Sequence, residues 1–289
     1  MKSFIDRYGA GYLFILPFFA LFGVFQLFPI VWTFYISTQE WSGLGQPRSV
    51  GLRNYQMLLR DPQFWDATQN TLIYWVCGLV FILPMAMGIS LLLNHRGLHG
   101  LRAFKTITFL PYVCATVAIG LIFNSMFDTQ QGLINEGLVA LGAQPVGWLT
   151  TTTWSKVPVI VLNVWRHTPW FALILLGGLL NIPRDYYEAA KVDGASSTRT
   201  FWHVTLPSLS PVIVFCMVMI TVESWNIFAE PFIMRGPGTS NMSLFQYMYE
   251  SSFKLFKYGY GATIGVALTV ILAIVSFAQF ALMRRGGEA

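Results

Sequence analysis

Charged residues are scarce in this chain of 289 residues, of which 11% are charged and 55% are hydrophobic. Average soluble proteins carry roughly 25% charged residues. The composition therefore excludes an ordinary soluble domain and indicates a membrane protein. Cysteine is also rare, and Cys77, Cys114 and Cys216 all fall in apolar stretches. We interpret them as packing residues and expect neither a disulfide framework nor a metal site.

The chain also lacks the motifs of common enzyme sites. It has no G-x-x-x-x-G-K-[ST] sequence, so it cannot hold ATP through a P-loop. It has no HExxH or GxSxG sequence and no clustered pair of carboxylates. We therefore expect no catalytic residue, no bound cofactor and no bound metal ion.

Long apolar runs dominate what remains. A membrane-spanning helix needs about 20 apolar residues. We predict one all-α integral membrane domain over residues 1–289, with six spans at about 11–37, 70–94, 106–127, 157–180, 211–229 and 261–282. The first run follows Lys2 and Arg7 as a signal peptide would, but it is too long and has no cleavage pattern after it. We interpret it as a retained span.

The basic residues predict how these spans are oriented. Six spans put both termini on one side of the membrane. That side carries ten Lys and Arg against five Asp and Glu, whereas seven of each cancel on the other side. Because basic residues mark the cytoplasmic side, we expect both termini in the cytoplasm. The net charge of +5 then reflects membrane topology and predicts no nucleic-acid partner.

A polar stretch at residues 185–207 separates the fourth and fifth spans. Asp185 and Glu188 have the spacing of a capping box, which would open a short helix. Gly194 suits the left-handed turn that ends a helix. The pattern predicts the first half of a helix-turn-helix elbow, and a plain polar loop is the alternative.

The second half of the elbow begins directly after this glycine. Ser196 or Ser197 can cap another short helix. Leu206-Pro207 is expected to stop it, because proline lacks the backbone N–H and clashes with the preceding turn. Small residues along the stretch would allow another molecule to approach closely.

The elbow also resembles a known motif. The matching residues are Glu188, Ala189, Ala190, Asp193, Gly194, Ala195, Val204, Leu206 and Pro207. They resemble the EAA loop of the membrane subunit of binding-protein-dependent ABC importers, most closely the maltose-type carbohydrate branch. The resemblance implies that Glu188, Ala189, Ala190, Asp193 and Gly194 form a cytoplasmic coupling helix that docks on an ATPase. It further implies two ATPase subunits carrying ATP and Mg²⁺, a second and homologous permease subunit, and an external substrate-binding protein. It also implies a place in the cytoplasmic membrane of a bacterium or archaeon.

Two charged residues lie inside predicted spans, Arg166 in the fourth and Glu223 in the fifth. Charged groups are costly in a membrane and mark either a pair or a functional site. One interpretation is a stabilising ion pair between the two spans. The other is a polar substrate pocket, because polar and aromatic residues surround both positions in the sequence.

The resemblance to maltose-type permeases sharpens the pocket. It implies sugar contacts at a tyrosine after Leu-Pro in the third span, along an N-x-W-x-x-x-P-aromatic pattern in the fourth, and at asparagine in the fifth. Arg166, His167 and Glu223 depart from the maltose pattern, which argues against maltose itself. The expected substrate-binding residues are Tyr112, Asn163, Arg166, His167, Trp170, Glu223 and Asn226.

The sequence thus predicts the permease subunit of an ATP-driven importer, forming half of a pore for a sugar or oligosaccharide. A polyol or a glycerol-phosphate-like substrate is one alternative, since Arg166 could pair with a phosphate. An ion-coupled secondary transporter with Glu223 as proton carrier is another. That transporter would need no ATPase and would leave the elbow unexplained.

Overall fold

The computed structural model describes residues 2–94 and 101–286, and their contacts gather in two compact units. The first unit comprises the chain up to Asp61 together with Tyr247–Thr269. The second comprises Pro62–Gln246 and the chain from Val270 onward. Within the described ranges, β-structure is limited to one short strand pair in the first unit.

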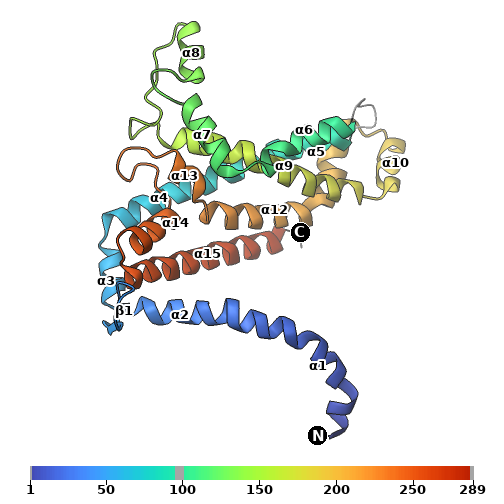
Figure 1. Ribbon diagram of the computed structural model, residues 1–289. Helices are drawn as coiled ribbons and strands as arrows, with labels where there is room; N and C mark the ends of the chain where they lie inside the picture. Colours follow the sequence, from blue (N-terminus) through green and yellow to red (C-terminus); the bar gives the residue numbers. More distant parts are fainter. Residues whose placement is uncertain (1, 95–100, 287–289) are drawn as a thin grey trace. The chain divides into compact units, whose positions relative to one another are not determined.

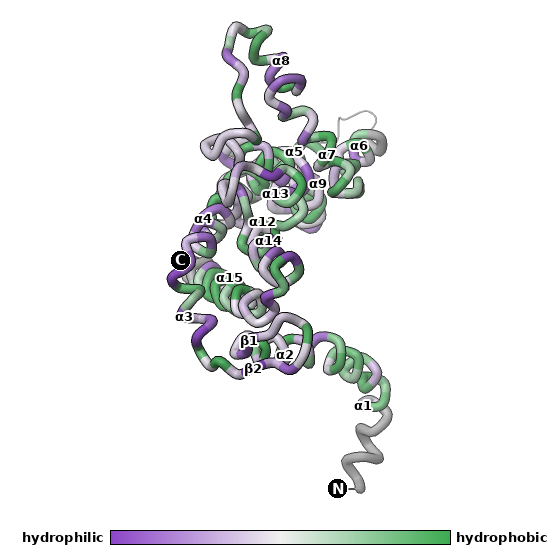
Figure 2. Tube along the Cα trace, turned by 60° about the vertical axis from the view of Figure 1, so that its left-hand side comes forward, coloured by the Kyte–Doolittle hydropathy of each residue, from purple (hydrophilic) through white to green (hydrophobic). Residues whose placement is uncertain are grey.

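The first unit begins with a long apolar helix. It consists of α1 (Lys2–Phe22), a π-helical turn (Gly23–Leu27) and α2 (Phe28–Ser37). Its membrane-compatible part, Gly11–Ser37, coincides with the predicted first span. None of the residues in the most apolar window of this span is buried, so the span presents apolar side chains to its surroundings, as Figure 2 shows by their hydropathy.

Short elements follow at the end of this helix. Strand β1 (Gln39–Glu40) pairs antiparallel with β2 (Arg48–Ser49), and the short helix α3 (Arg53–Leu59) follows. Later in the chain come α14 (Leu244–Tyr249), a π-helical turn (Glu250–Lys254) and α15 (Tyr258–Gly286).

Buried polar contacts hold the short elements of the first unit together. The Asn54 amide donates to the backbone oxygens of Ser37 at 2.9 Å and Gln39 at 2.8 Å. The hydroxyls of Tyr247 and Tyr260 both donate to the Asp61 carboxylate. Burial disfavours the phenolate and raises the pKa of Tyr247 to about 12. Its phenol therefore stays protonated, as a donor to Asp61 must.

The second unit is a helical bundle arranged around one central helix. Its helices are α4 (Pro62–Cys77), a π-helical turn (Gly78–Ile82), α5 (Leu83–Asn94), α6 (Leu101–Val113), α7 (Thr116–Met126), α8 (Leu133–Ala140), α9 (Lys156–Leu180), α10 (Arg184–Val192), α11 (Ser197–Thr200), a π-helical turn (Phe201–Thr205), α12 (Leu206–Trp225) and α13 (Ala229–Ile233). Helix α9 contacts α5, α6, α12 and α13 (Figure 1). The residues that fill this core are Ile82, Ala86, Val164, Phe171, Ala172, Leu175, Cys216 and Ile220.

The third span differs from the unbroken helix that the hydropathy predicts. Its two halves, α6 and α7, meet at Cys114 and Ala115 with a bend of 93°. Ala115 has extended backbone angles, with φ of −61° and ψ of 122°. Five helices in the described chain are long and apolar enough to span a membrane, and the bent pair makes a sixth if it crosses once. The fold is therefore the all-α membrane architecture expected.

Prolines inside the spans explain three of the π-helical turns. The turns Gly23–Leu27, Gly78–Ile82 and Phe201–Thr205 each end two residues before a proline, at Pro29, Pro84 and Pro207. Proline lacks a backbone N–H and its ring clashes with the carbonyl four residues earlier. A widened turn moves that carbonyl away. Leu206-Pro207 therefore does not stop the helix after the elbow, contrary to the prediction, and the helix continues through Pro207 to Trp225.

Gly259 allows close packing in the first unit. A Cβ atom at this position would overlap the backbone oxygen of Gln39, which cannot move without shifting the strand. We predict that Gly259→Ala destabilises the purified subunit by about 1–3 kcal/mol, the usual cost of overpacking. The measurement is thermal unfolding in detergent. Gly88→Ala is the matched control, because a Cβ there meets open space. An unchanged unfolding midpoint for Gly259→Ala would contradict the close approach.

Candidate functional site

The middle of α9 carries a cluster of charged and aromatic side chains within the second unit. Arg166, His167 and Trp170 come from α9 itself. Tyr112 comes from α6, and the carboxylates come from Glu223 in α12 and Glu230 in α13. Four helices thus supply the cluster, so its geometry depends on how they pack.

Arg166 is compensated on three sides. Its Nη1 atom lies 3.7 Å from Glu230 Oε1 and 3.2 Å from His167 Nε2. Its guanidinium carbon lies 5.8 Å from the centre of the Tyr112 ring, within range of a cation–π contact. The Nε atom of Arg166 is buried and has no hydrogen-bond partner among the described residues. The arginine is therefore neutralised but not fully hydrogen-bonded.

The contacts of His167 define where its proton lies. Nδ1 is 2.9 Å from the backbone oxygen of Asn163, which can only accept, so Nδ1 carries the hydrogen. In the neutral ring Nε2 is then an acceptor, and Arg166 donates to it. Glu223 Oε2 is 3.8 Å from the same Nε2 atom. The imidazole thus stands between the arginine and a second carboxylate.

The charges of the cluster do not favour an anionic ligand. One guanidinium and one imidazole face two carboxylates, so the cluster carries no net positive charge in either form of the imidazole. Glu230 is 4% exposed, and a buried carboxylate persists only when a nearby cation compensates it. The positive charge of Arg166 is therefore already balanced by acidic residues of the protein itself. A phosphate that entered the cluster would be repelled by Glu223 and Glu230.

An aromatic stack forms one wall of the cluster. The rings of Tyr112 and Trp170 are 4.9 Å apart and nearly parallel, with an interplanar angle of 10°. Phe109 lies 6.4 Å from Trp170, and His167 meets the Tyr112 ring edge-on at 6.4 Å. The structure thus brings charged groups and flat apolar rings together, as the sequence led us to expect.

Two expected residues contribute less directly. Asn163 is buried, and it is its backbone oxygen that binds His167. Asn226 follows the last turn of α12, and its amide donates to the Val222 carbonyl at 2.8 Å. Among the described residues, no contact joins the Asn226 side chain to Arg166 or His167. Its role as a substrate contact stays a prediction.

The ion pairs differ from the one considered in the sequence. Arg166 was paired with Glu223, but its carboxylate contact is Glu230, whereas Glu223 lies against His167. Glu230 lies just beyond the predicted end of the fifth span at about residue 229, so it was not among the predicted site residues. No local sequence signal identifies it, because α12 ends at Trp225 and the short helix α13, which carries Glu230, begins only at Ala229.

The elbow between α9 and α12 forms a second candidate site. Helix α10 begins after Pro183, so Asp185 and Glu188 lie within the helix and form no capping box, contrary to the prediction. Pro183 stands at the N-cap position and offers no side-chain acceptor, but its missing N–H removes one of the groups that would lack a partner within the helix. The end of the helix is as expected, because Gly194 has a φ of +72° and the Ala195 N–H bonds back to Ala190.

The second half of the elbow is capped by Ser196, whose hydroxyl accepts from the backbone N–H of Arg199 at 3.3 Å. Apolar side chains of α10 are exposed in spite of the polar sequence, with Tyr186 55% and Val192 87% exposed. Ala189 and Glu188 are also exposed, whereas Ala190 packs inward. The elbow thus offers a small mixed surface for a partner.

Comparisons with known proteins place these features in context. A family model described as the inner membrane component of binding-protein-dependent transport systems matches residues 85–286. The chain is similar to the lactose transport system permease protein LacF of Rhizobium radiobacter, with 36% identity over 288 residues and 96% of each chain covered. It is also similar to the arabinooligosaccharides transport system permease protein AraP of Bacillus subtilis, with 33% identity over 277 residues, 94% of this chain and 88% of AraP.

A solved structure shares the fold. It is a chain of a bacterial alginate ABC transporter in complex with an alginate pentasaccharide-bound periplasmic protein. The two chains superpose with a TM-score of 0.86 at 22% identity, covering 100% of this chain and 99% of the other. This likeness supports the helix arrangement.

Removing the carboxylate beside Arg166 tests the charge cluster. We predict that Glu230→Ala costs about 3–5 kcal/mol, because it leaves a guanidinium in the apolar interior without its acid. Glu230→Gln should cost less, since the amide oxygen can still accept a hydrogen bond. The measurement is the yield and thermal unfolding of the purified subunit, with the exposed Glu136→Ala as control. Equal stability of Glu230→Ala and wild type would show that the pair carries no compensation.

Proposed function

The chain belongs to the family of inner membrane components of binding-protein-dependent transport systems, and we propose that it forms half of the pore through which a neutral sugar or oligosaccharide is imported. The chain is a permease subunit and not an enzyme. The observation that carries the substrate proposal is the Arg166 cluster, where under-satisfied donors and two carboxylates lie beside a stacked aromatic pair. Family membership argues against the ion-coupled transporter considered in the sequence.

A sugar suits this cluster chemically. Its hydroxyls both donate and accept hydrogen bonds, so they can meet the guanidinium and the carboxylates together. The apolar faces of pyranose rings pack well on aromatic side chains. LacF and AraP are named for lactose and arabinooligosaccharide transport. The proposed contacts are Tyr112, Asn163, Arg166, His167, Trp170, Glu223 and Asn226, with Glu230 added.

A phosphorylated polyol fits less well. The sequence left this substrate open because Arg166 could bind a phosphate. In the structure the arginine already faces Glu230, and Glu223 stands across His167. A phosphate at this place would displace one carboxylate from the cation and leave it in the apolar interior, which is costly.

The elbow is the proposed point of coupling to the ATPase. Glu188, Ala189, Ala190, Asp193 and Gly194 would form the coupling surface, and exposed Val192 and Tyr186 would add apolar contacts. ATP and Mg²⁺ would bind to two partner ATPase subunits, because this chain has no P-loop. Their closure would push on α10, and the spans would follow. Cytoplasmic termini, as the basic residues indicate, put the elbow on the ATPase side.

A second permease subunit and an external binding protein complete the proposal. The unburied apolar side chains of Gly11–Ser37 need cover from lipid or a neighbouring chain. A homologous second permease would supply part of it. The solved alginate transporter was captured with a periplasmic protein, and we propose that a binding protein delivers sugar to the outer loops of this chain.

Substrate class is tested by ATPase activity of the assembled transporter in lipid, with its binding protein. We predict stimulation by a neutral disaccharide or oligosaccharide, and less than a tenth of it by sugar or polyol phosphates, because of the two carboxylates. Trp170→Ala should raise the half-saturating sugar concentration about two- to tenfold, since a stacked ring contributes about 0.5–1.5 kcal/mol. Exposed Trp65→Ala serves as control. Stimulation by phosphates alone would overturn the neutral-sugar proposal.

Coupling is tested at α10. We predict that Glu188→Lys and Gly194→Asp abolish sugar uptake while the subunit still inserts and assembles. Both changes alter the exposed elbow and leave the core untouched. Gly194→Ala is the control for backbone strain, because any side chain is unfavourable at a φ of +72°. The readouts are uptake by vesicles and recovery of the ATPase with the permease. Normal uptake in Glu188→Lys and Gly194→Asp would rule out the coupling role.

A further inference from the structure

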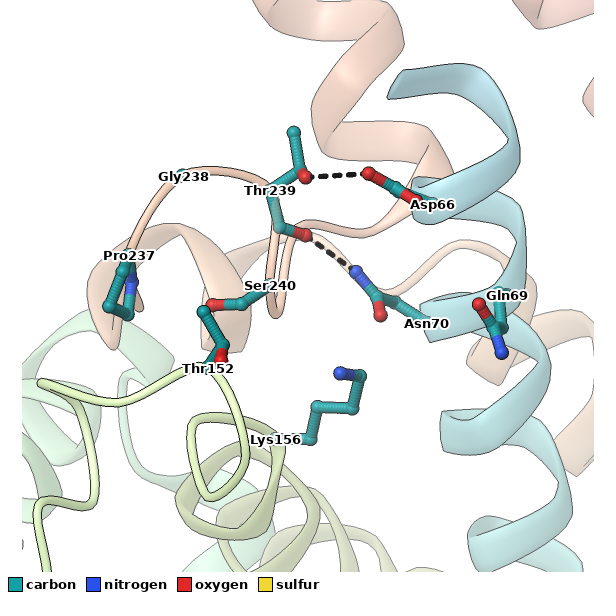
Figure 3. Close-up of a pocket in the computed structure, with 9 residues that line it drawn as sticks. All are labelled: Asp66, Gln69, Asn70, Thr152, Lys156, Pro237, Gly238, Thr239 and Ser240. Carbon is teal, nitrogen blue, oxygen red and sulfur yellow. Dashed lines mark hydrogen bonds between the residues drawn. The ribbon is translucent and has the colours of Figure 1, made fainter. Parts of the chain in front are cut away.

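A polar recess lies at the beginning of α9, ten residues before Arg166 and therefore about 15 Å along the helix. Its volume is about 480 Å³. The start of α4 forms one side, the start of α9 another, and the turn at residues 237–240 closes the third (Figure 3). The recess thus lies apart from the Arg166 cluster and belongs entirely to the second unit.

The frame of this recess is fixed by hydrogen bonds. The Asn70 amide nitrogen donates to the backbone oxygens of Thr239 at 2.7 Å and Met242 at 3.0 Å. The Thr239 hydroxyl donates to Asp66 at 2.9 Å, and the Ser155 hydroxyl donates to Ser240 at 2.9 Å. The turn is therefore tied to both α4 and α9, so the recess is formed before any ligand arrives.

Several polar groups that line the recess have no hydrogen-bond partner among the described residues. Asn70 is 4% exposed, and its two N–H groups are used, so its Oδ1 atom is left as an acceptor of fixed direction. The Lys156 ammonium points into the recess (Figure 3). In the described chain neither Asn70 Oδ1 nor Lys156 Nζ has a hydrogen-bond partner, and Gln69 and the Thr152 hydroxyl add further donors and acceptors at the rim.

The charges of the recess balance. Lys156 contributes one positive charge and Asp66 one negative charge, on facing walls. A ligand with net charge would be attracted by one wall and repelled by the other. A neutral ligand that offers both donors and acceptors would satisfy the lysine and the asparagine together.

We propose that this recess is a saccharide subsite at the outer mouth of the pore, which takes one neutral sugar unit by hydrogen bonds to Lys156, Asn70 and Gln69. Its volume lies within the range of about 300–1,000 Å³ that ligand pockets span. The proposal rests on the proposed function for its orientation, because α4 and α9 both begin on the side opposite the elbow. A sugar would be held here before it moves along α9 to the Arg166 cluster.

Cysteine protection tests this subsite without requiring transport. Thr152→Cys is introduced at the rim, and the assembled transporter in nanodiscs is treated with a charged methanethiosulfonate reagent. We expect 50–100 mM lactose or maltotriose, a range set on the order of weak sugar affinities, to slow the reaction at least about threefold. The same concentration of betaine, a zwitterion without hydroxyls, should not. Gln131→Cys, on the exposed loop after α7, is the matched control and should react equally in both.

A second substitution tests whether the protection of Thr152→Cys depends on the recess. Lys156→Met keeps the length of the side chain but removes its donors, and it should abolish protection of Thr152→Cys by sugar. Lys257→Met, outside the recess, should not. Unslowed reaction of Thr152→Cys in every sugar would overturn the subsite. Protection by the ligand-free binding protein alone would also overturn it, because the recess would then receive protein side chains.

A parallel measurement distinguishes failure of the subsite from failure of the proposed function. Sugar-stimulated ATPase activity is measured on the unsubstituted transporter in parallel. Stimulation without protection would remove the subsite and leave the importer intact. Protection without stimulation would keep the subsite and withdraw the proposed transport of these sugars.

Discussion

A guanidinium carried by a helix inside the membrane requires compensation from its neighbours, because an unpaired charge in apolar surroundings is costly. Arg166 receives it from three other helices, through Glu230 on α13, the Tyr112 ring on α6, and His167, which faces Glu223 on α12. These contacts act only when the four helices meet at the right depth. The charge thus specifies how the apolar helices pack, which nonpolar contacts alone would leave less defined.

The N-terminal end of the same helix is organised by backbone groups. The chain between α13 and α14 is irregular, and its carbonyl and N–H groups need partners. Asn241 donates to the backbone oxygens of Ser155 and Met234, Tyr74 donates to the backbone oxygen of Asn241, and the Leu244 N–H donates to Thr71. Side chains of α4 and residues at the start of α9 thus hold this segment, so both ends of the proposed sugar path are built on α9.

Apolar run length predicted where the long apolar helices lie, because the length of a span must match the thickness of the bilayer. The length of an apolar run carries no information about the direction of the backbone, so the bend at Cys114–Ala115 was not predicted. Local chemistry was right at Gly194 and Ser196, where one residue decides the backbone. It was wrong at Asp185, where Pro183 already begins the helix, and at Pro207, which a wider turn accommodates. The partner of Arg166 depended on packing between helices, which local sequence does not encode.

The charges around Arg166 are balanced, but the cluster does not use all of its capacity for hydrogen bonds. Its two carboxylate contacts measure 3.7 and 3.8 Å, well beyond the ~2.7–2.9 Å of a strong charge-assisted hydrogen bond. In the described part of the chain, the buried Nε atom of the arginine has no hydrogen-bond partner. Charge balance therefore stabilises the fold, while hydrogen-bonding capacity remains for a guest. A hydroxyl placed between cation and carboxylate can bond to both, so a neutral sugar gains contacts where an anion would have to break the existing pairs.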